Sequence, residues 1–276
     1  MAGVDDGYVM VAKTDNCKGI CSMLSAILLK KDIVAFCVMD RNGFKFTVEM
    51  AGALQASVYL KHELFTEYRC TEKQQFGIQM SHLLECLNIF GGSSNSYVAL
   101  TLKYAGEGRP LLLEMVDAGV LSSSGVSTMD CGDPTDFLWN DSPLVNKTIL
   151  QANPLRDALS ELDWWGGTLT LEMSTGTPTL RMYSKGEMGG CVIEFPPECD
   201  PFDECACTED TREDYRFSLL QCVLKALALS DKACLRVNRI GMLSVQLMIR
   251  NDSPVTTFVE FLICADANEA EFGDAQ

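Results

Sequence analysis

The stretch ICSMLSAI, at Ile20–Ile27, carries the same arrangement of apolar residues as LRDALSEL, at Leu155–Leu162, which lies 135 residues further along the chain. In both stretches the apolar side chains take the first, fourth, fifth and eighth positions, which places them on one face of an α-helix. A second pair repeats the pattern: MSHLLECL at Met80–Leu87 and LQCVLKAL at Leu220–Leu227 lie 140 residues apart. Two offsets that nearly agree indicate that one unit, with two amphipathic helices, occurs twice.

The segments between these helices are predicted to be β-strands. Apolar and polar residues alternate over Phe44–Met50, as expected for a strand with one buried face. The preceding Asp40–Gly43 ends in Asn-Gly, which is a strong hairpin signal because both residues tolerate positive φ. Ile33–Met39 is therefore predicted to be the partner strand. Because several further stretches alternate in the same way, we predict an α+β fold with antiparallel sheets and four short helices.

The composition between the two copies predicts a connector. Gly119–Asn146 is rich in Ser, Gly, Asp and Pro and almost free of basic residues. We therefore predict a first domain at residues 1–118, an interdomain connecting loop at 119–146 and a second domain at 147–276. Inside the later copy, Glu198–Asp214 is crowded with acids and contains a proline, so we expect a solvated, mobile loop there.

Composition and charge limit the classes of protein that fit the chain. Its 276 residues are 47% hydrophobic, which is enough to build packed cores. The net charge of -16 argues against a conventional DNA-binding module, so any contact with DNA must be local. The 13 cysteines lie mostly in apolar runs, which favours a reducing compartment, the cytosol or the nucleus. No targeting signal is expected at Met1–Asp6, and no apolar run is long enough to cross a bilayer.

Several segments in both halves resemble one known family, the Rad-one subunit of the nine-one-one checkpoint clamp, which is a relative of PCNA. The resemblance is carried by Asn146–Gln151 running into Leu155–Asp163, by Leu84–Gly91, and by Met248–Asn251 followed by Phe258–Glu260. None of these motifs is a chemical fingerprint by itself. Their order and spacing over most of the chain make the resemblance specific, although Cys199–Asp214 and much of the connector contribute nothing to it.

The resemblance implies a DNA clamp fold, in which two tandem similar domains place antiparallel sheets outside and four short helices on the concave face. It further implies a ring of three subunits, completed by a Rad-nine-like and a Hus-one-like chain, that encircles double-stranded DNA without sequence specificity. A clamp loader, repair enzymes and checkpoint mediators would be its other partners, and the nucleus its location. No catalysis by this subunit and no cofactor are required.

In a clamp, basic residues on the polar faces of the helices would reach phosphates from inside the ring. The candidates are Lys18, Lys30, Lys31, Arg156 and Lys225. The alternative is an ordinary solvated helix surface, and the acids Glu85, Asp157 and Glu161 on the same helices dilute the basic charge. We expect Lys30 and Lys31 near the end of their helix, where the helix dipole would favour them without any ligand.

Ring closure in this fold pairs an edge strand of one subunit with an edge strand of the next. The resemblance places those edges near Leu111–Val116 and Thr179–Tyr183, with the ring interface at Leu111, Leu113, Met115, Leu180 and Met182. The alternative is that both are internal strands. The resemblance also suggests a pocket for a hydrophobic partner peptide at Phe65, Met248 and Phe258, although such residues are more often simple core.

Catalytic and metal chemistry have few candidates. Cys205 and Cys207, with Cys199 and Cys191, could supply zinc thiolates, but their spacing is not the usual Cys-x-x-Cys pair. The two histidines, His62 and His82, sit in no recognisable motif, and no Gly-rich phosphate loop is present. We therefore expect neither a catalytic nor a metal site. Two alternatives remain: a homotrimeric processivity clamp, and a metal-dependent 3'-5' exonuclease that would use the acids Asp200, Asp203, Glu204, Glu209, Asp210 and Asp214.

Overall fold

The computed structural model describes residues 7–90, 98–163, 167–176, 180–187, 189–196, 199–249 and 255–266. The chain divides into two compact units. The first is formed by Met1–Met50, Ala56–Thr135 and Arg250–Val259, and the second by Ala51–Gln55, Asp136–Ile249 and Glu260–Gln276. No helix among the described residues is both long and apolar enough to span a bilayer.

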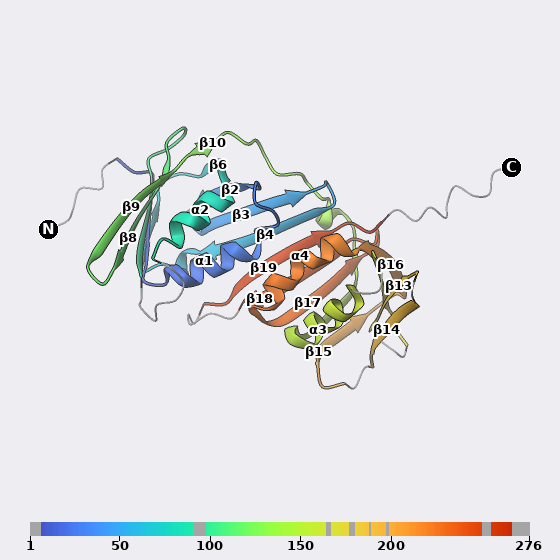
Figure 1. Cartoon of the computed structure of the whole chain (residues 1–276). Coiled ribbons are helices and arrows are strands. Elements are labelled where there is room, and N and C mark those ends of the chain that lie inside the picture. The colour runs from blue at the N-terminus through green and yellow to red at the C-terminus, as the bar shows by residue number, and fades with distance from the viewer. Residues whose placement is uncertain are drawn as a thin grey trace. The chain divides into compact units, whose positions relative to one another are not determined.

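The first half of the chain contains two helices, α1 and α2, among short strands (Figure 1). In chain order the elements are β1 (Met10–Thr14), α1 (Cys17–Ala26), β2 (Val34–Asp40), β3 (Gly43–Met50), β4 (Leu54–Lys61), η1 (His62–Leu64), β5 (Glu67–Cys70), β6 (Gln74–Gln79), α2 (Met80–Leu87), β7 (Ala99–Tyr104), β8 (Leu111–Asp117), β9 (Val120–Val126) and β10 (Thr128–Met129).

The second half contains a matching series around the helices α3 and α4. After η2 (Trp139–Asp141) the elements are β11 (Leu144–Gln151), α3 (Ala152–Asp163), β12 (Thr168–Met173), β13 (Leu180–Gly186), β14 (Gly189–Phe195), β15 (Phe202–Cys207), β16 (Thr211–Arg216), α4 (Phe217–Leu227), β17 (Ser230–Asn238), β18 (Leu243–Ile249) and β19 (Thr257–Ile263).

The two series repeat one topology, which confirms the duplication predicted from the helices. Each begins with a strand and a helix, continues with five strands and a second helix, and ends with three strands, to which the first series adds the two-residue β10. The strand orders also match: β5-β1-β7-β8-β9 corresponds to β15-β11-β17-β18-β19, and β6-β2-β3-β4 to β16-β12-β13-β14. All pairings described residue by residue are antiparallel. The predicted α+β class is correct.

The four helices form where the sequence predicts them, and their apolar faces are buried. Fifteen of the sixteen apolar positions in the two patterns are buried, and the remaining one, Leu224, is half-buried. Each such side chain stabilises the fold by about 1.5–3 kcal/mol when fully buried. Within each unit the two helices lie side by side, α1 against α2 and α3 against α4 (Figure 1). The side chain of Asn16 caps α1, because its Oδ1 accepts a hydrogen bond from the Gly19 N–H at 2.8 Å.

The predicted hairpin between β2 and β3 is confirmed. Asp40 pairs with Gly43, and the Asp40 carboxylate accepts a hydrogen bond from the Asn42 N–H at 2.7 Å. Gly43 has φ +141°, and a Cβ there would lie 2.2 Å from the carbonyl oxygen of Leu60. Only glycine fits at this position, because a side chain would meet both an unfavourable backbone conformation and the adjacent strand.

The stretch 119–146 differs from the plain connecting loop that its composition predicts. It contains β9, which pairs along its whole length with β8, and β10, which pairs with β6. β11 begins at Leu144, so residues 130–143 are the part without a strand. Polar and small residues led to the loop prediction, but Val120–Val126 gains its hydrogen bonds from a neighbouring strand. The domain boundaries at 118 and 147 stay a prediction.

The acidic stretch is not a loop. Except for Glu198, which lies outside the described residues, it consists of a turn at residues 199–201 followed by β15 and β16, which a second short turn joins. β15 pairs with β11 and β16 with β12, so the two strands belong to different sheets of the second unit. Like charges in the sequence predicted solvation, but basic residues from other strands neutralise several of them, as the ion pairs below show.

Candidate ring-closing and DNA-facing surfaces

The predicted DNA-facing cations lie in three different settings. Lys18 on α1 and Lys225 on α4 are exposed. Arg156 on α3 is half-buried, and its Nη2 lies 2.9 Å from Oδ1 of Asp157, which offsets part of its charge. Lys30 and Lys31 are exposed in the turn between α1 and β2.

The prediction that Lys30 and Lys31 sit at a helix end is wrong. α1 ends at Ala26, and the C-cap Ile27 donates its N–H to the carbonyl oxygens of Leu24 and Ser25. The dipole effect fades within the last turn of a helix, so it does not account for two lysines several residues beyond that turn. Both remain available to solvent.

The helices share little of the chain's acidic excess. Their 41 residues contain three basic residues and the four acids Glu85, Asp157, Glu161 and Asp163, against 22 bases and 38 acids in the whole chain. The helical surfaces are therefore nearly neutral in a protein of net charge -16. Such a surface permits a weak approach of DNA and provides too few cations for tight binding.

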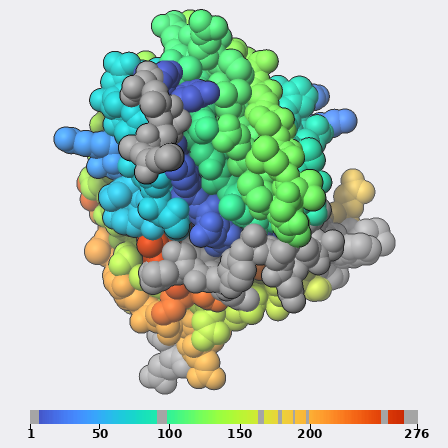
Figure 2. All heavy atoms as spheres, turned by 90° about the vertical axis from the view of Figure 1, so that its left-hand side faces the viewer, coloured from blue at the N-terminus to red at the C-terminus, as the bar shows by residue number. Residues whose placement is uncertain are grey.

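The predicted edge strands are internal, which corrects the sequence analysis. β8 lies between β7 and β9, and β13 lies between β12 and β14. Each neighbours an edge strand one place further out, β9 beside β8 and β14 beside β13; β5, β16, β10 and β15 are the other terminal strands of the three sheets. Figure 2 shows the β8–β9 hairpin (green) facing the viewer along the first unit.

The five residues predicted at the ring interface point into the core. Leu111, Leu113, Met115, Leu180 and Met182 are each at most 1% exposed. Thr179, at the start of the second predicted edge, lies outside the described residues. Because the first five residues of β8 and of β13 alternate between buried and accessible, their buried apolar positions form the inner face of each sheet. The burial of these side chains does not support an interface role, which stays a prediction.

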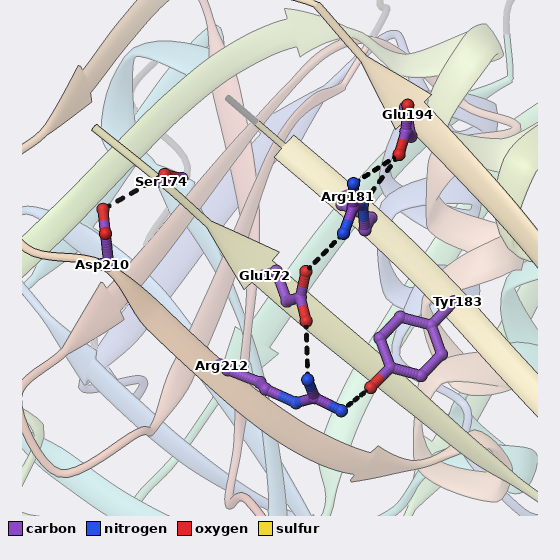
Figure 3. A network of polar contacts seen from close by, with 7 residues as sticks. All are labelled: Glu172, Ser174, Arg181, Tyr183, Glu194, Asp210 and Arg212. Carbon is purple, nitrogen blue, oxygen red and sulfur yellow. Dashed lines mark hydrogen bonds and ion pairs between the residues drawn. The ribbon is translucent and has the colours of Figure 1, made fainter. Parts of the chain in front are cut away.

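The outer face of β12–β14 and β16 carries a row of alternating charges that crosses all four strands (Figure 3). Arg181 on β13 contacts Glu194 on β14 at 2.7 Å and Glu172 on β12 at 3.4 Å. Glu172 also contacts Arg212 on β16 at 3.1 Å. We call Glu194, Arg181, Glu172 and Arg212 the charge row. Registered strand pairing produces it, because each residue lies directly opposite the next.

A shallow hollow of about 670 Å³ lies along the charge row. Besides the four charged residues, Tyr183 and Val192 line it. The Arg212 guanidinium lies over the Tyr183 ring, 5.3 Å from the centroid, and donates a hydrogen bond to its hydroxyl (Figure 3). Sequence reasoning missed this surface, since its members come from four strands and only the register brings them together.

The three residues predicted for a partner-peptide pocket have different surroundings. Phe65 is 8% exposed, and its ring centroid lies 5.6 Å from both Phe44 and Tyr68. It belongs to an aromatic cluster in the first unit, which is the core alternative considered above. Met248 on β18 is half-buried, whereas Phe258 on β19 is 39% exposed. A peptide site at these positions stays a prediction.

In the strand-free part of the connector, residues 130–143, Trp139 anchors the chain to the second unit. Trp139 stacks beneath the Arg236 guanidinium, which lies 5.5 Å from the ring centroid. Arg236 also donates to Glu260 at 2.5 Å and to Ser244 at 2.9 Å. The nearby Leu138 adopts a left-handed conformation with φ 52°, and Phe137 is 9% exposed. This anchoring fixes the chain direction just before β11.

The acids proposed for a nuclease face different partners instead of one another. Asp203 contacts Lys232 at 2.8 Å, Glu204 contacts Lys147 at 2.9 Å, and Glu209 contacts Arg239 at 2.5 Å. Asp210 accepts hydrogen bonds from Ser174 and Thr175, and Asp214 accepts one from Thr170. Over the described ranges, no three His, Cys, Asp or Glu side chains converge as a metal site would require.

The thiols also lack the environment of a reactive or metal-bound group. Cys205 and Cys207 lie on one face of β15 with their sulfur atoms 3.8 Å apart, without Cys191 or Cys199 completing a metal cluster within the described part of the chain. Burial, reinforced by the neighbouring Cys205, raises the pKa of Cys207 to about 12. Burial likewise raises the pKa of Cys17 to about 12. A reactive cysteine or a metal ligand must be a thiolate, and these groups are held neutral.

Comparison with known proteins adds family and fold. Residues 9–249 match the family described as repair protein Rad1/Rec1/Rad17. The chain is 35% identical to the human cell cycle checkpoint protein RAD1 over 270 residues, which cover 97% of this chain and 95% of that protein. It is 30% identical to the Schizosaccharomyces pombe DNA damage checkpoint control protein rad1 over 278 residues, covering 91% and 85%.

The fold also matches a solved structure. PCNA from Thermococcus kodakaraensis superposes with a TM-score of 0.77 over 93% of this chain and 100% of that one, at 17% identity. At this identity the likeness concerns the fold alone. Two tandem units of the observed topology are thus the PCNA-like clamp fold.

Proposed function

The chain belongs to the Rad1 family of repair proteins, and we propose that it is a subunit of a DNA-encircling sliding clamp that acts in the DNA damage checkpoint. It joins two related but different chains, one Rad-nine-like and one Hus-one-like, in a ring that a clamp loader places on duplex DNA. In the nucleus the ring holds repair enzymes and checkpoint mediators. The observation that carries the proposal is a duplicated clamp unit with free edge strands, β9 and β14, on its two copies.

A ring can close because each subunit offers two different edge strands, β9 and β14. β9 of one subunit pairs with the β14-type edge of the next, which makes the contact head-to-tail, and such contacts generate rings when the rotation closes. Each pairing satisfies backbone groups that an exposed edge leaves unpaired. The subunits on either side of this chain therefore meet different surfaces, as a ring of unlike chains requires.

Contact with DNA is weak and independent of sequence. Lys18, Arg156 and Lys225 on the helices approach phosphates, with Lys30 and Lys31 as further contacts from the turn after α1. The acidic remainder of the chain repels DNA, so the ring encircles the duplex without gripping it. This combination allows sliding.

The subunit has no catalytic task in this proposal. Asp203, Glu204 and Glu209 are each paired with a different basic residue, and burial keeps the Cys17 and Cys207 thiols neutral. The chain is therefore expected to leave labelled duplex intact in Mn²⁺. Degradation by the wild type that disappears in Asp203→Asn with Glu204→Gln would establish the nuclease alternative instead.

Gel filtration with light scattering tests the assembly. The purified chain alone is expected to be a monomer, and a ring of one copy of each subunit should form on mixing with the two related clamp subunits of the same organism. A homotrimer formed by the chain alone would support the replicative alternative. Failure of the mixed chains to associate would overturn the proposal.

Retention of loaded rings on circular DNA tests the helical face. Lys18→Glu with Lys225→Glu should shorten retention and lower the slope of log retention against log salt concentration by about 2, because two phosphate contacts are lost. Lys45→Glu is the matched control, since Lys45 is an exposed lysine on β3 and not on a helix. Equal loss in the control and the double variant would remove the DNA role of the helices.

A further inference from the structure

The charge row ends on an acid at a free edge. It runs from Arg212 through Glu172 and Arg181 to Glu194 on β14, and no further strand follows β14 in the order of its sheet. The Glu194 carboxylate meets Arg181 on one side only and keeps 47% of its side-chain surface exposed. An added strand would place its own residue directly beside this carboxylate.

The same edge strand also carries an exposed apolar residue. Two residues before Glu194, on the same face of β14, lies Val192, which is 58% exposed and pairs with Tyr183. These two residues line the hollow together with the charge row. A long side chain from an added strand could lie in this hollow, with its aliphatic part against Val192 and its charge near the carboxylates.

We propose that β14 selects the neighbouring subunit by its charge: the partner's edge strand presents a lysine or arginine beside Glu194 and an apolar residue beside Val192, two positions away. The proposal rests on the ring function above and adds the chemistry of one neighbour. Opposite charges directly across two strands stabilise their pairing, and like charges disfavour it. An acidic residue in the partner at this position would place a like charge beside the Glu194 carboxylate at the end of the row.

The same reasoning excludes a second copy of this chain as the neighbour. Its β9, the free edge strand of the first unit, has the sequence VLSSSGV and contains no basic residue. Its exposed apolar residues, Val120 and Leu121, are consecutive and carry no cation two positions away. β9 therefore cannot continue the charge row, which favours a ring of unlike chains over a homotrimer.

Association of the full chain with each related clamp subunit of the same organism tests the proposal. Relative to wild type, Glu194→Gln should weaken binding to one of the two subunits about threefold, and Glu194→Lys roughly tenfold, with binding to the other subunit unchanged. The salt dependence of that same association should diminish in Glu194→Gln, because an ion pair between subunits is screened by salt.

Two controls separate folding from selection. Glu63→Lys makes the same charge change at an exposed glutamate of the first unit and should leave both associations unchanged. Thermal unfolding of Glu194→Lys reports whether the variant still folds; if it does not, Glu194→Gln alone decides.

The partner side of the contact gives a stricter test. A lysine or arginine on the bound subunit's edge strand, changed to glutamate, should weaken wild-type binding and restore binding to Glu194→Lys. Wild-type ring formation with unchanged affinity in both Glu194 variants would overturn the charge selection and leave the ring function standing. Absence of any ring with wild-type chains would instead overturn the ring function.

Discussion

The outer faces of two equivalent sets of four strands, β6-β2-β3-β4 and β16-β12-β13-β14, differ, although their strand orders are the same. In the first unit, residues 129–135 lie against parts of β3 and β6. The Glu49 carboxylate accepts hydrogen bonds from the Thr135 N–H at 2.6 Å and hydroxyl at 2.8 Å. A Cβ added to Gly77 would lie 2.9 Å from side-chain atoms of Met129 and Cys131. In the second unit the corresponding face is open and carries the charge row.

This difference indicates that the two copies kept similar inner faces after duplication, whereas their outer faces diverged. The inward-facing positions are apolar in both copies, because the sheets of each copy must cover that copy's own pair of helices. Outward positions are constrained only by solvent or by a partner, so one face came to bind the chain's own segment and the other an ion-pair network. Fold equivalence therefore says little about which surface binds what.

The largest expected effects come from the inward positions that both units share. Leu113→Ala in the first unit and Leu180→Ala in the second should each lower the free energy of unfolding by about 2–5 kcal/mol, because each leaves a cavity under its sheet. Chemical denaturation measures this, with Leu121→Ala, 70% exposed, as a control that should change it by less than about 0.5 kcal/mol. Weakened subunit association without loss of stability would reinstate these residues at the ring interface.

A smaller effect on stability is expected from a difference between β1 and β11, the first strands of the two units. Met10 and Asn146 occupy equivalent places, since each pairs with the last residue of the neighbouring strand, Cys70 or Cys207. The Asn146 amide donates to the Glu209 carbonyl at 2.8 Å and to the Thr211 hydroxyl at 2.9 Å, and its oxygen accepts from the Thr208 N–H at 3.0 Å. The methionine in the first unit forms no such bonds.

Asn146→Met should therefore lower the free energy of unfolding by about 1–3 kcal/mol, because the turn after β15 loses its buried partners. Hydrogen exchange should show earlier opening of the Thr208 amide than in the wild type. Asn153→Met, at an exposed position in α3, is the control. Equal stability in both variants would mean that the turn is held without the amide.

The sequence predicts what local periodicity determines. The helices could be placed from the spacing of residues such as Met80 and Leu83, and the β2–β3 hairpin from Asn42 and Gly43, because those signals lie within a few neighbouring residues. Alternation also predicts correctly that alternate residues of β8 and β13 are buried. It says nothing about which strand lies beside which.

The candidate site depends on that missing information. The family resemblance placed each edge one strand too far inward. β8 and β13 are the more apolar strands, whereas edge strands favour polar, small or charged residues. The serines of VLSSSGV and the glycines that begin β14 were signals that could have indicated it. The acids of β15 were predicted to be solvated, since their partners Lys147 and Lys232 are remote in sequence.

Breaking the charge row should have a modest effect on stability. Glu172→Gln removes the acid that contacts both Arg181 and Arg212, and leaves two cations without their shared partner. Because both arginines are well exposed, solvent screening limits the expected loss in free energy of unfolding to about 0.5–1.5 kcal/mol. Glu67→Gln, which breaks a more exposed pair with Lys13, should cost less than about 0.5 kcal/mol. A loss in Glu172→Gln no greater than in this control would show that the row does not act as a network.

The smallest expected effect comes from a difference between two connections, the one that joins β2 to β3 and the one that joins β12 to β13. The first is a tight turn, whereas the start of the second, at Ser174 and Thr175, is held by Asp210 from the β15–β16 turn. Hydrogen bonds from the Thr175 N–H, the Thr175 hydroxyl and the Ser174 hydroxyl lower the pKa of Asp210 below its ordinary value of 3.8. A carboxylate whose pKa is lower in the folded state stabilises the fold above its ordinary pKa, and this contribution is lost as pH falls through the folded-state pKa.

Asp210→Asn should therefore lower the melting temperature slightly at pH 7, and the difference from wild type should shrink as pH falls below 3.8. Thermal melts at pH 7 and pH 3 measure this, with the exposed Asp15→Asn of the first unit as the control. A difference that stayed constant with pH would mean that the negative charge of Asp210 does not contribute to stability. The long connection would then be held by hydrogen-bond geometry without help from charge.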